Sequence, residues 1–175
     1  SWEGSHRFSL MRTLVMDVGG TRSRAILWCR GEGELRGDES RLVEGPGANP
    51  NRVGTQTTSK TIAALVNELN IADNTVDKLV IGLAGYSHAD SFEAVRNGIK
   101  QSGLAIDETK AWLMSDAELA HIAAFGCDTE DCDGILLIAG TGSIALARLS
   151  TDGISQSPSI IRAGGHGYQN GDQGS

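Results

Sequence analysis

The stretch Thr13-Leu-Val-Met-Asp-Val18 is apolar and rich in strand-forming residues, and the pair Gly19-Gly20 interrupts it. A second stretch of the same character, Arg24-Ala-Ile-Leu-Trp-Cys29, follows after only a few residues. Two such stretches joined by a short glycine turn are typical of a β-hairpin. We therefore expect the fold to begin with a hairpin closed by glycine.

Helices and strands alternate after this hairpin. A third strand is expected around residues 35–43, and the glycines and prolines of residues 45–50 then break the pattern. Apolar spacing next predicts a helix through Ile62, Leu65, Val66 and Leu69, a strand over 78–84, a helix through Phe92, Val95 and Ile99, a strand over 111–114 and a helix through Leu119, Ile122 and Ala123. The predicted order is βββαβαβα, which makes this an α/β protein.

The opening pattern is repeated later in the chain. Gly134-Ile-Leu-Leu-Ile-Ala139 predicts a strand, Gly140-Thr-Gly142 a glycine turn, and Ile144-Ala-Leu-Ala-Arg-Leu149 a second strand. A further strand is expected over 159–163, followed by a glycine-rich segment that reaches Ser175. Two related units are therefore predicted, and the second has no helix after its strands.

This repeat predicts the organisation of the chain. Residues 1–10 are expected to be a tag or frayed tail, residues 11–132 a complete N-terminal lobe, and residues 133–175 the truncated start of a second lobe. We therefore expect the sequence to be a fragment of a longer protein.

Composition excludes several classes of function. The chain has 175 residues, of which 39% are apolar and 21% charged, and no apolar run approaches the roughly 18 residues of a membrane span. The net charge of -7 arises between Asp107 and Asp133, and no basic stripe offers a surface for nucleic acid or anionic lipid. The three cysteines form no CxxC pair, which favours a reducing, cytoplasmic location. Cys127 and Cys132 lie in an acidic stretch whose spacing matches no zinc pattern, so a surface loop is expected there.

The two glycine turns are the candidate phosphate-binding elements. Glycine lets backbone amides approach a phosphate closely, because no side chain stands in the way. Asp17 at the end of the first strand is suited to Mg²⁺, and hydroxyl and guanidinium groups can bond phosphate oxygens. The candidate phosphate ligands are Gly19, Gly20, Thr21 and Arg22 in the first turn and Gly140, Thr141 and Gly142 in the second.

The second turn also matches a dinucleotide-binding pattern, because Gly140, Gly142 and Ala145 follow the spacing GxGxxA. That pattern requires a long helix directly afterwards, and the turn Asp152-Gly153 comes too soon for one. A dinucleotide site is therefore disfavoured.

Further polar residues stand where chemistry is expected. Ser115 lies three residues before Glu118, which is a capping box and places Asp116 in the first turn of a helix, where its carboxylate could act as a base. Asn49 and Asp172, with Gln173, are side chains that suit sugar hydroxyls. His166 lies with Asp172 and Gln173 in the glycine-rich segment near the end of the sequence. For a lone histidine there, a packing or surface role is expected.

Taken together, the motifs resemble the BadF/BadG/BcrA/BcrD ATPase family, and within it the N-acetylglucosamine and glucosamine kinases. The resemblance covers residues 11–175 in unbroken motif order. It is carried by Asp17-Val-Gly-Gly-Thr21, Gly47-Ala-Asn49, Gly82-Leu-Ala-Gly85, Ser115-Asp-Ala117, Ala139-Gly-Thr-Gly-Ser143, Gly164-Gly-His-Gly167 and Gly171-Asp-Gln-Gly-Ser175. It implies the actin-like, sugar kinase and Hsp70 fold, with two ribonuclease H-like lobes and ATP in the cleft between them.

The resemblance also implies roles for individual residues. Asp17 matches the magnesium-side aspartate, Gly140 to Gly142 the second phosphate motif, and Asp116 the catalytic base. Asn49, Gly165 and Asp172 match positions that hold the sugar in the family. His166 also stands at a sugar-binding position. His166 stands where N-acetylglucosamine kinases usually carry tryptophan, and Gln173 where they usually carry glutamate. These two departures from the family pattern favour glucosamine as the substrate.

The leading hypothesis is an amino-sugar kinase that uses ATP and Mg²⁺ to phosphorylate the 6-hydroxyl of N-acetylglucosamine or glucosamine. The alternatives are a BadF-type ATPase that activates a partner enzyme, a ROK-like hexokinase and a non-catalytic sugar sensor. A small-molecule amino sugar is the expected partner, and homodimer formation is left open. Family members are nearly twice as long, so the 175-residue chain alone is expected to be inactive.

Overall fold

The computed structural model of the chain describes residues 10–31, 39–86, 89–126, 133–139, 143–149 and 159–165. They belong to two compact units, one within residues 1–115 and one within residues 116–175. The predicted lobe boundary at residues 132 and 133 stays a prediction.

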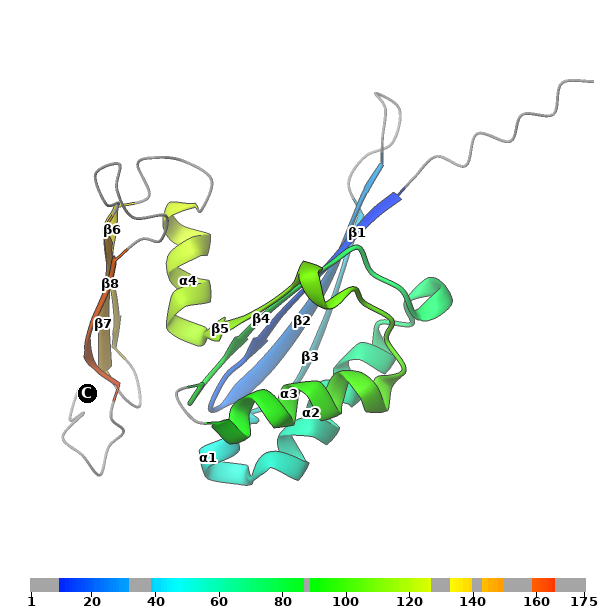
Figure 1. Cartoon of the computed structure of the whole chain (residues 1–175), viewed down its shortest axis with the longest axis horizontal. Coiled ribbons are helices and arrows are strands. Elements are labelled where there is room, and N and C mark those ends of the chain that lie inside the picture. The colour runs from blue at the N-terminus through cyan, green and yellow to red at the C-terminus, as the bar shows by residue number, and fades with distance from the viewer. Residues whose placement is uncertain are drawn as a thin grey trace, which may run out of the picture. The chain divides into compact units, whose positions relative to one another are not determined.

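The first unit is built on a five-stranded mixed sheet with the order β3-β2-β1-β4-β5 (Figure 1). Its strands are β1 (Leu10–Val18), β2 (Arg22–Gly31), β3 (Glu39–Pro46), β4 (Lys78–Leu83) and β5 (Ala111–Ser115). Strands β1, β2 and β3 are antiparallel neighbours, whereas β4 pairs in parallel with both β1 and β5. The predicted hairpin is confirmed, and β1 begins at Leu10, which the sequence analysis assigned to the tail.

The helices of this unit follow the predicted order. They are α1 (Pro50–Val53), α2 (Thr55–Glu68) and α3 (Ala89–Ser102), together with the 3-10 turns η1 (Ala72–Asn74) and η2 (Glu108–Lys110). Both α2 and α3 lie on one face of the sheet (Figure 1). The two helices approach each other closely at Gly98 on α3: a Cβ added there would lie 2.8 Å from the Ile62 side chain on α2. The Ser59 hydroxyl also donates a hydrogen bond to the Ala94 carbonyl at 2.8 Å.

Alternate residues of the central strands form the core with the apolar face of α2. Burial is complete or nearly so for Leu14, Met16, Val18, Ala25, Leu27, Ile62, Leu65, Val66, Leu69, Leu79, Ile81 and Leu83. On α3, one residue of the predicted apolar pattern differs, since Phe92 is 59% exposed. The reason is that the preceding Ser91 is buried and donates its hydroxyl to the Gly85 carbonyl, so Phe92 points away from the sheet.

The second unit consists of α4 (Asp116–Phe125) and a three-stranded antiparallel sheet, β6 (Gly134–Ala139), β7 (Ser143–Leu149) and β8 (Ser159–Gly164). Ala139 pairs with Ser143, and the ladder continues to Gly134 with Arg148. The predicted repeat of the hairpin is therefore confirmed in its strands.

Helix α4 packs through residues that the spacing analysis did not select. Ala117 and His121 are its buried residues, whereas Ala123 is exposed. His121 Nε2 lies 2.9 Å from the Gly134 carbonyl oxygen, and its ring contacts the Phe125 ring in a tilted arrangement with centroids 4.6 Å apart. The prediction placed Leu119, Ile122 and Ala123 on the packed face of the helix. In the structure the contact of His121 with β6 turns the His121 side of the helix toward the sheet instead. Among the described residues, no helix is long and apolar enough to cross a membrane.

Candidate functional site

The first glycine turn, between β1 and β2, is closed by its own backbone. The Gly19 amide donates a hydrogen bond to the Arg22 carbonyl at 3.1 Å. A Cβ added to Gly19 would lie 2.6 Å from that same oxygen, a separation that real side chains do not adopt. Glycine is therefore required at position 19 for the turn to close.

The segment after β3 lies directly on this turn. The Gly47 amide donates to the Thr21 carbonyl at 3.1 Å, and the Ala48 amide donates to the Gly19 carbonyl at 2.9 Å. A side chain on Gly47 would collide with the Gly20 carbonyl oxygen. The segment that leads to Asn49 is thus held against the glycine turn by backbone contacts alone.

Asn49 begins the short helix α1. Its Oδ1 atom accepts a hydrogen bond from the Asn51 amide at 2.9 Å, and Pro50 occupies the first helical position. The Asn51 side chain donates in turn to the Gly85 carbonyl at 3.4 Å. Gly85 has φ +75, and a Cβ there would lie 2.6 Å from Asn49 Oδ1. The end of β4 therefore closes over the Asn49 side chain.

Three segments far apart in the sequence meet at this place. They are the glycine turn, residues 47–52 and the residues just after β4, where the Ala84 amide donates to the Val18 carbonyl at 2.9 Å. The structure brings together the predicted phosphate ligands Gly19, Gly20 and Thr21 and the predicted sugar ligand Asn49. We call this convergence the first-turn site.

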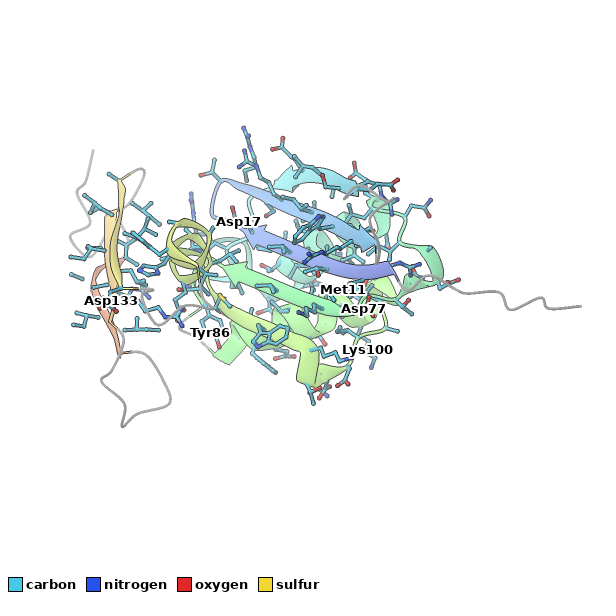
Figure 2. All side chains as sticks on the ribbon, turned by 90° about the horizontal axis from the view of Figure 1, so that it is seen from above. Met11, Asp17, Asp77, Tyr86, Lys100 and Asp133 are labelled. Atoms are coloured by element: carbon cyan, nitrogen blue, oxygen red, sulfur yellow. The ribbon has the colours of Figure 1, made fainter. Side chains whose placement is uncertain are left out.

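Asp17 lies near the carboxyl end of β1 (Figure 2). Its neighbours Met16 and Val18 are fully buried, so the Asp17 side chain points to the opposite face of the sheet and is exposed. Its register partners are Arg24 on β2 and Gly82 on β4. Because Gly82 is a glycine, its position on β4 puts no side chain against the Asp17 carboxylate.

Arg22, a predicted phosphate ligand, lies near an acidic residue in this structure. Its Nη1 atom is 3.6 Å from Glu44 Oε1, and Arg24 Nε donates to the same oxygen at 2.8 Å. The hydrogen bond from Arg24, together with the charge of Arg22, lowers the pKa of the Glu44 carboxyl. The first two arginines after the turn therefore share one carboxylate.

A third arginine, which the sequence analysis did not single out, lies at the turn itself. A Cβ added to Gly20 would be 3.9 Å from Nη1 of Arg52, the third residue of α1. Nothing local in the sequence signals this approach, because it depends on the backbone contacts that hold residues 47–49 against the turn.

The remaining described candidates belong to the second unit. Asp116 lies in the first turn of α4, as predicted, is half-buried, and its Oδ1 atom accepts from the Ala117 amide at 2.9 Å. Gly165, with φ +76, donates its amide to the Ser143 carbonyl at 2.9 Å and accepts from Arg162 Nη2 at 3.0 Å. Gly165 is therefore tied to the strand that follows the second glycine turn.

Several predicted residues lie outside the described part of the chain. These are Gly140, Thr141 and Gly142 of the second turn, His166, Asp172 and Gln173 of the glycine-rich segment, and Cys127 and Cys132. Within the described ranges, no group of three or more histidine, cysteine, aspartate or glutamate residues is placed to hold a metal ion.

The architecture defines the class of fold. Three antiparallel strands, two further parallel strands with helices on one face of the sheet, and a repeat of the opening hairpin form a mixed α/β fold that solved hexokinase and glucokinase structures share.

Structural comparison identifies two sugar kinases with this fold. A hexokinase from Schistosoma mansoni complexed with glucose aligns with a TM-score of 0.56 and 16% identity, over 90% of this chain and 43% of that one. A glucokinase from Balamuthia mandrillaris in complex with glucose aligns with a TM-score of 0.57 and 10% identity, over 91% of this chain and 49% of that one. The chain thus spans less than half the length of either kinase. No protein-family model and no curated protein matches the sequence.

Proposed function

We propose that this chain is part of an ATP-dependent sugar kinase that phosphorylates the 6-hydroxyl of an amino sugar, N-acetylglucosamine or glucosamine. The observation that carries the proposal is the first-turn site, where the Gly47 and Ala48 amides bind the glycine turn and so bring Asn49 beside it. A phosphate-binding turn and a sugar-binding side chain at one place are what phosphate transfer to a sugar requires. The fold shared with two glucose-complexed kinases supports the same class.

The residues present fit ATP and Mg²⁺. Gly20 is exposed, and a Cβ there would meet only the end of the Arg52 side chain, so the backbone of the turn can be approached on that side; the Asp17 carboxylate is exposed as well. When bound, Mg²⁺ would neutralise charge on the transferred phosphate. In this proposal Gly20 and Thr21 bind phosphate oxygens, Gly19 closes the turn through its own amide, and Asp17 orients the metal through its water ligands.

The acceptor side of the reaction rests on Asn49 and Asp116. Asn49 would hold the sugar, and Asp116 would orient its 6-hydroxyl and take the proton as the phosphate arrives. Gly165, His166 and Asp172 complete the proposed sugar ligands, and residues 140–142 the proposed phosphate ligands. The cytoplasm is the proposed location, since ATP and a reducing environment are found together there.

The test uses the open reading frame that contains these residues, expressed to its own stop codon. Phosphate transfer from Mg·ATP to glucosamine, N-acetylglucosamine, N-acetylmuramic acid and glucose is measured for the parent protein and for Asp116→Asn. We expect transfer to one amino sugar and a loss of about 100-fold or more in the variant. Glu108→Gln, an exposed carboxylate in η2, is the matched control and should keep the parent rate.

Two results would contradict the proposal. An unchanged rate in Asp116→Asn would remove this residue from the reaction, and sugar binding without transfer would favour a sensor. The 175-residue chain alone is predicted to show no sustained transfer.

A further inference from the structure

We propose that Arg52 is the cationic phosphate ligand of the first-turn site and binds the terminal phosphate of the donor. The inference rests on the proposed function for the identity of that phosphate, whereas the anion site itself rests on geometry. Among the described residues other than the chain neighbours of Gly20, Nη1 of Arg52 is the one atom within 4 Å of a Cβ placed on Gly20, so the end of the guanidinium lies beside the exposed side of the glycine turn.

Arg52 is held in this position by a well-anchored backbone. Its amide donates to the Asn49 carbonyl at 2.9 Å, and the Gly54 amide donates to the Pro50 carbonyl at 2.9 Å, which closes α1. The fully buried Thr58 hydroxyl lies 2.9 Å from the Ala48 carbonyl oxygen and fixes the entry to the helix. The backbone of Arg52 is therefore fixed near the turn, close enough for its side chain to reach Gly20.

The charges around the turn distinguish Arg52 from its neighbours. Arg22 and Arg24 both face Glu44, so that carboxylate offsets part of their charge. Arg52 is exposed, and among the residues that the structure describes its side chain has neither a hydrogen bond nor an ion pair. The N–H donors of such a guanidinium are available to an anion with several oxygens, such as a phosphate.

Sterics lead to the same assignment. Gly19 and Gly47 have no room for a side chain because backbone oxygens are in the way, whereas at Gly20 only the flexible end of Arg52 is near. A phosphate group could therefore enter the turn from the Gly20 side, where it would meet the guanidinium.

The test uses inorganic tripolyphosphate as the probe, because it has the phosphates of ATP without the adenosine. The 175-residue chain is titrated with it, and binding is followed by the backbone amide NMR signals of Gly19, Gly20 and Thr21. We expect Arg52→Ala to weaken binding by about tenfold or more and Arg52→Lys by less. Arg22→Ala should weaken binding less than Arg52→Ala does, because Glu44 already offsets part of the Arg22 charge. Arg96→Ala, which removes an exposed arginine of α3, is the matched control and should change binding less than twofold.

Three outcomes would overturn the inference: unchanged binding in Arg52→Ala, a larger loss in Arg22→Ala than in Arg52→Ala, and no response of the turn amides to the probe in the parent chain. Because Arg52 is exposed, the spectra outside the site should show that each variant is folded. Failure of the proposed function is separable, since Arg52-dependent tripolyphosphate binding without any sugar phosphorylation would leave this inference standing. Conversely, sugar phosphorylation at an unchanged rate in Arg52→Ala would support the proposed function and overturn this inference.

Discussion

The two units of the molecule contain the same hairpin in different surroundings. In each unit the residue that follows the third strand donates its amide to a carbonyl where the second strand begins: Gly47 donates to Thr21, the residue before β2, and Gly165 donates to Ser143, the first residue of β7. Yet Leu14 on β1 is fully buried, whereas Ile135 and Leu137 on β6 are 73% and 70% exposed. The hairpin thus sets the turn and the strand pairing, but the helices α2 and α3 create the core.

The turns also differ in chemistry. Aligning the two motifs places Asp17 opposite Ala139, so a carboxylate precedes only the first turn. In our proposal the first turn therefore has a carboxylate that can orient a metal, whereas the sequence of the second turn provides amides and hydroxyls. The repeat has one architecture and two different roles in our proposal.

The largest expected effect contrasts a buried with an exposed leucine. Leu14→Ala should destabilise the first unit by about 2–5 kcal/mol, because it leaves a cavity in a fully packed core. Leu137→Ala in the second unit should change stability by less than about 0.5 kcal/mol. Amide hydrogen exchange on β1 and β6 measures both, since it reports the opening of each strand separately. Equal losses would show that the β6 face is covered in solution and would break the comparison.

A second prediction sharpens the role of the backbone contacts at the first turn. Gly47→Ala should destabilise the first unit by about 1–3 kcal/mol, because its Cβ would push against the Gly20 carbonyl. Gly20→Ala is the matched control in the same site, and we expect less than about 0.5 kcal/mol there because the added Cβ meets only the end of Arg52. Urea unfolding followed by Trp28 and Trp112 fluorescence tests both, and a tolerant Gly47→Ala would refute the close packing.

The smallest effect concerns pH. The pKa of Glu44 is lowered from 4.5 in the folded protein, so its ionised form is favoured by folding. The stabilisation is present above the unfolded pKa and disappears as the pH falls through the lowered, folded value. Glu44→Gln should therefore reduce the Tm slightly at pH 7 and leave it unchanged near pH 2. A difference between the two proteins that persists at low pH would assign the effect to something other than charge.

Strand and helix positions were predictable because they depend on local periodicity. The hairpin, the helix through Ile62 and Leu65 and the repeat at residue 134 are all readable from apolar spacing. The contact of Gly47 with Thr21 and the approach of Arg52 to Gly20 were not predictable in this way. They join segments that are distant in the chain, and a backbone hydrogen bond leaves no signature in residue type.

Sequence likewise could not identify the residues that turn inward on α3 and α4. Ser91 and His121 are polar residues, so the apolar pattern does not mark them as buried. Each is nevertheless buried because its side chain contacts a backbone carbonyl, that of Gly85 for Ser91 and that of Gly134 for His121. Asp17, Asn49 and Asp116 were found from motifs, and their roles stay predictions until the reaction is measured.

The most direct measurement is phosphorus NMR of the products formed by the complete reading frame from Mg·ATP and an amino sugar. The account predicts a new phosphate ester signal, split by the two protons on carbon 6 of the sugar, that grows as the γ-phosphate of ATP disappears. Inorganic phosphate as the only product, or no loss of ATP with any of the four sugars, would contradict it.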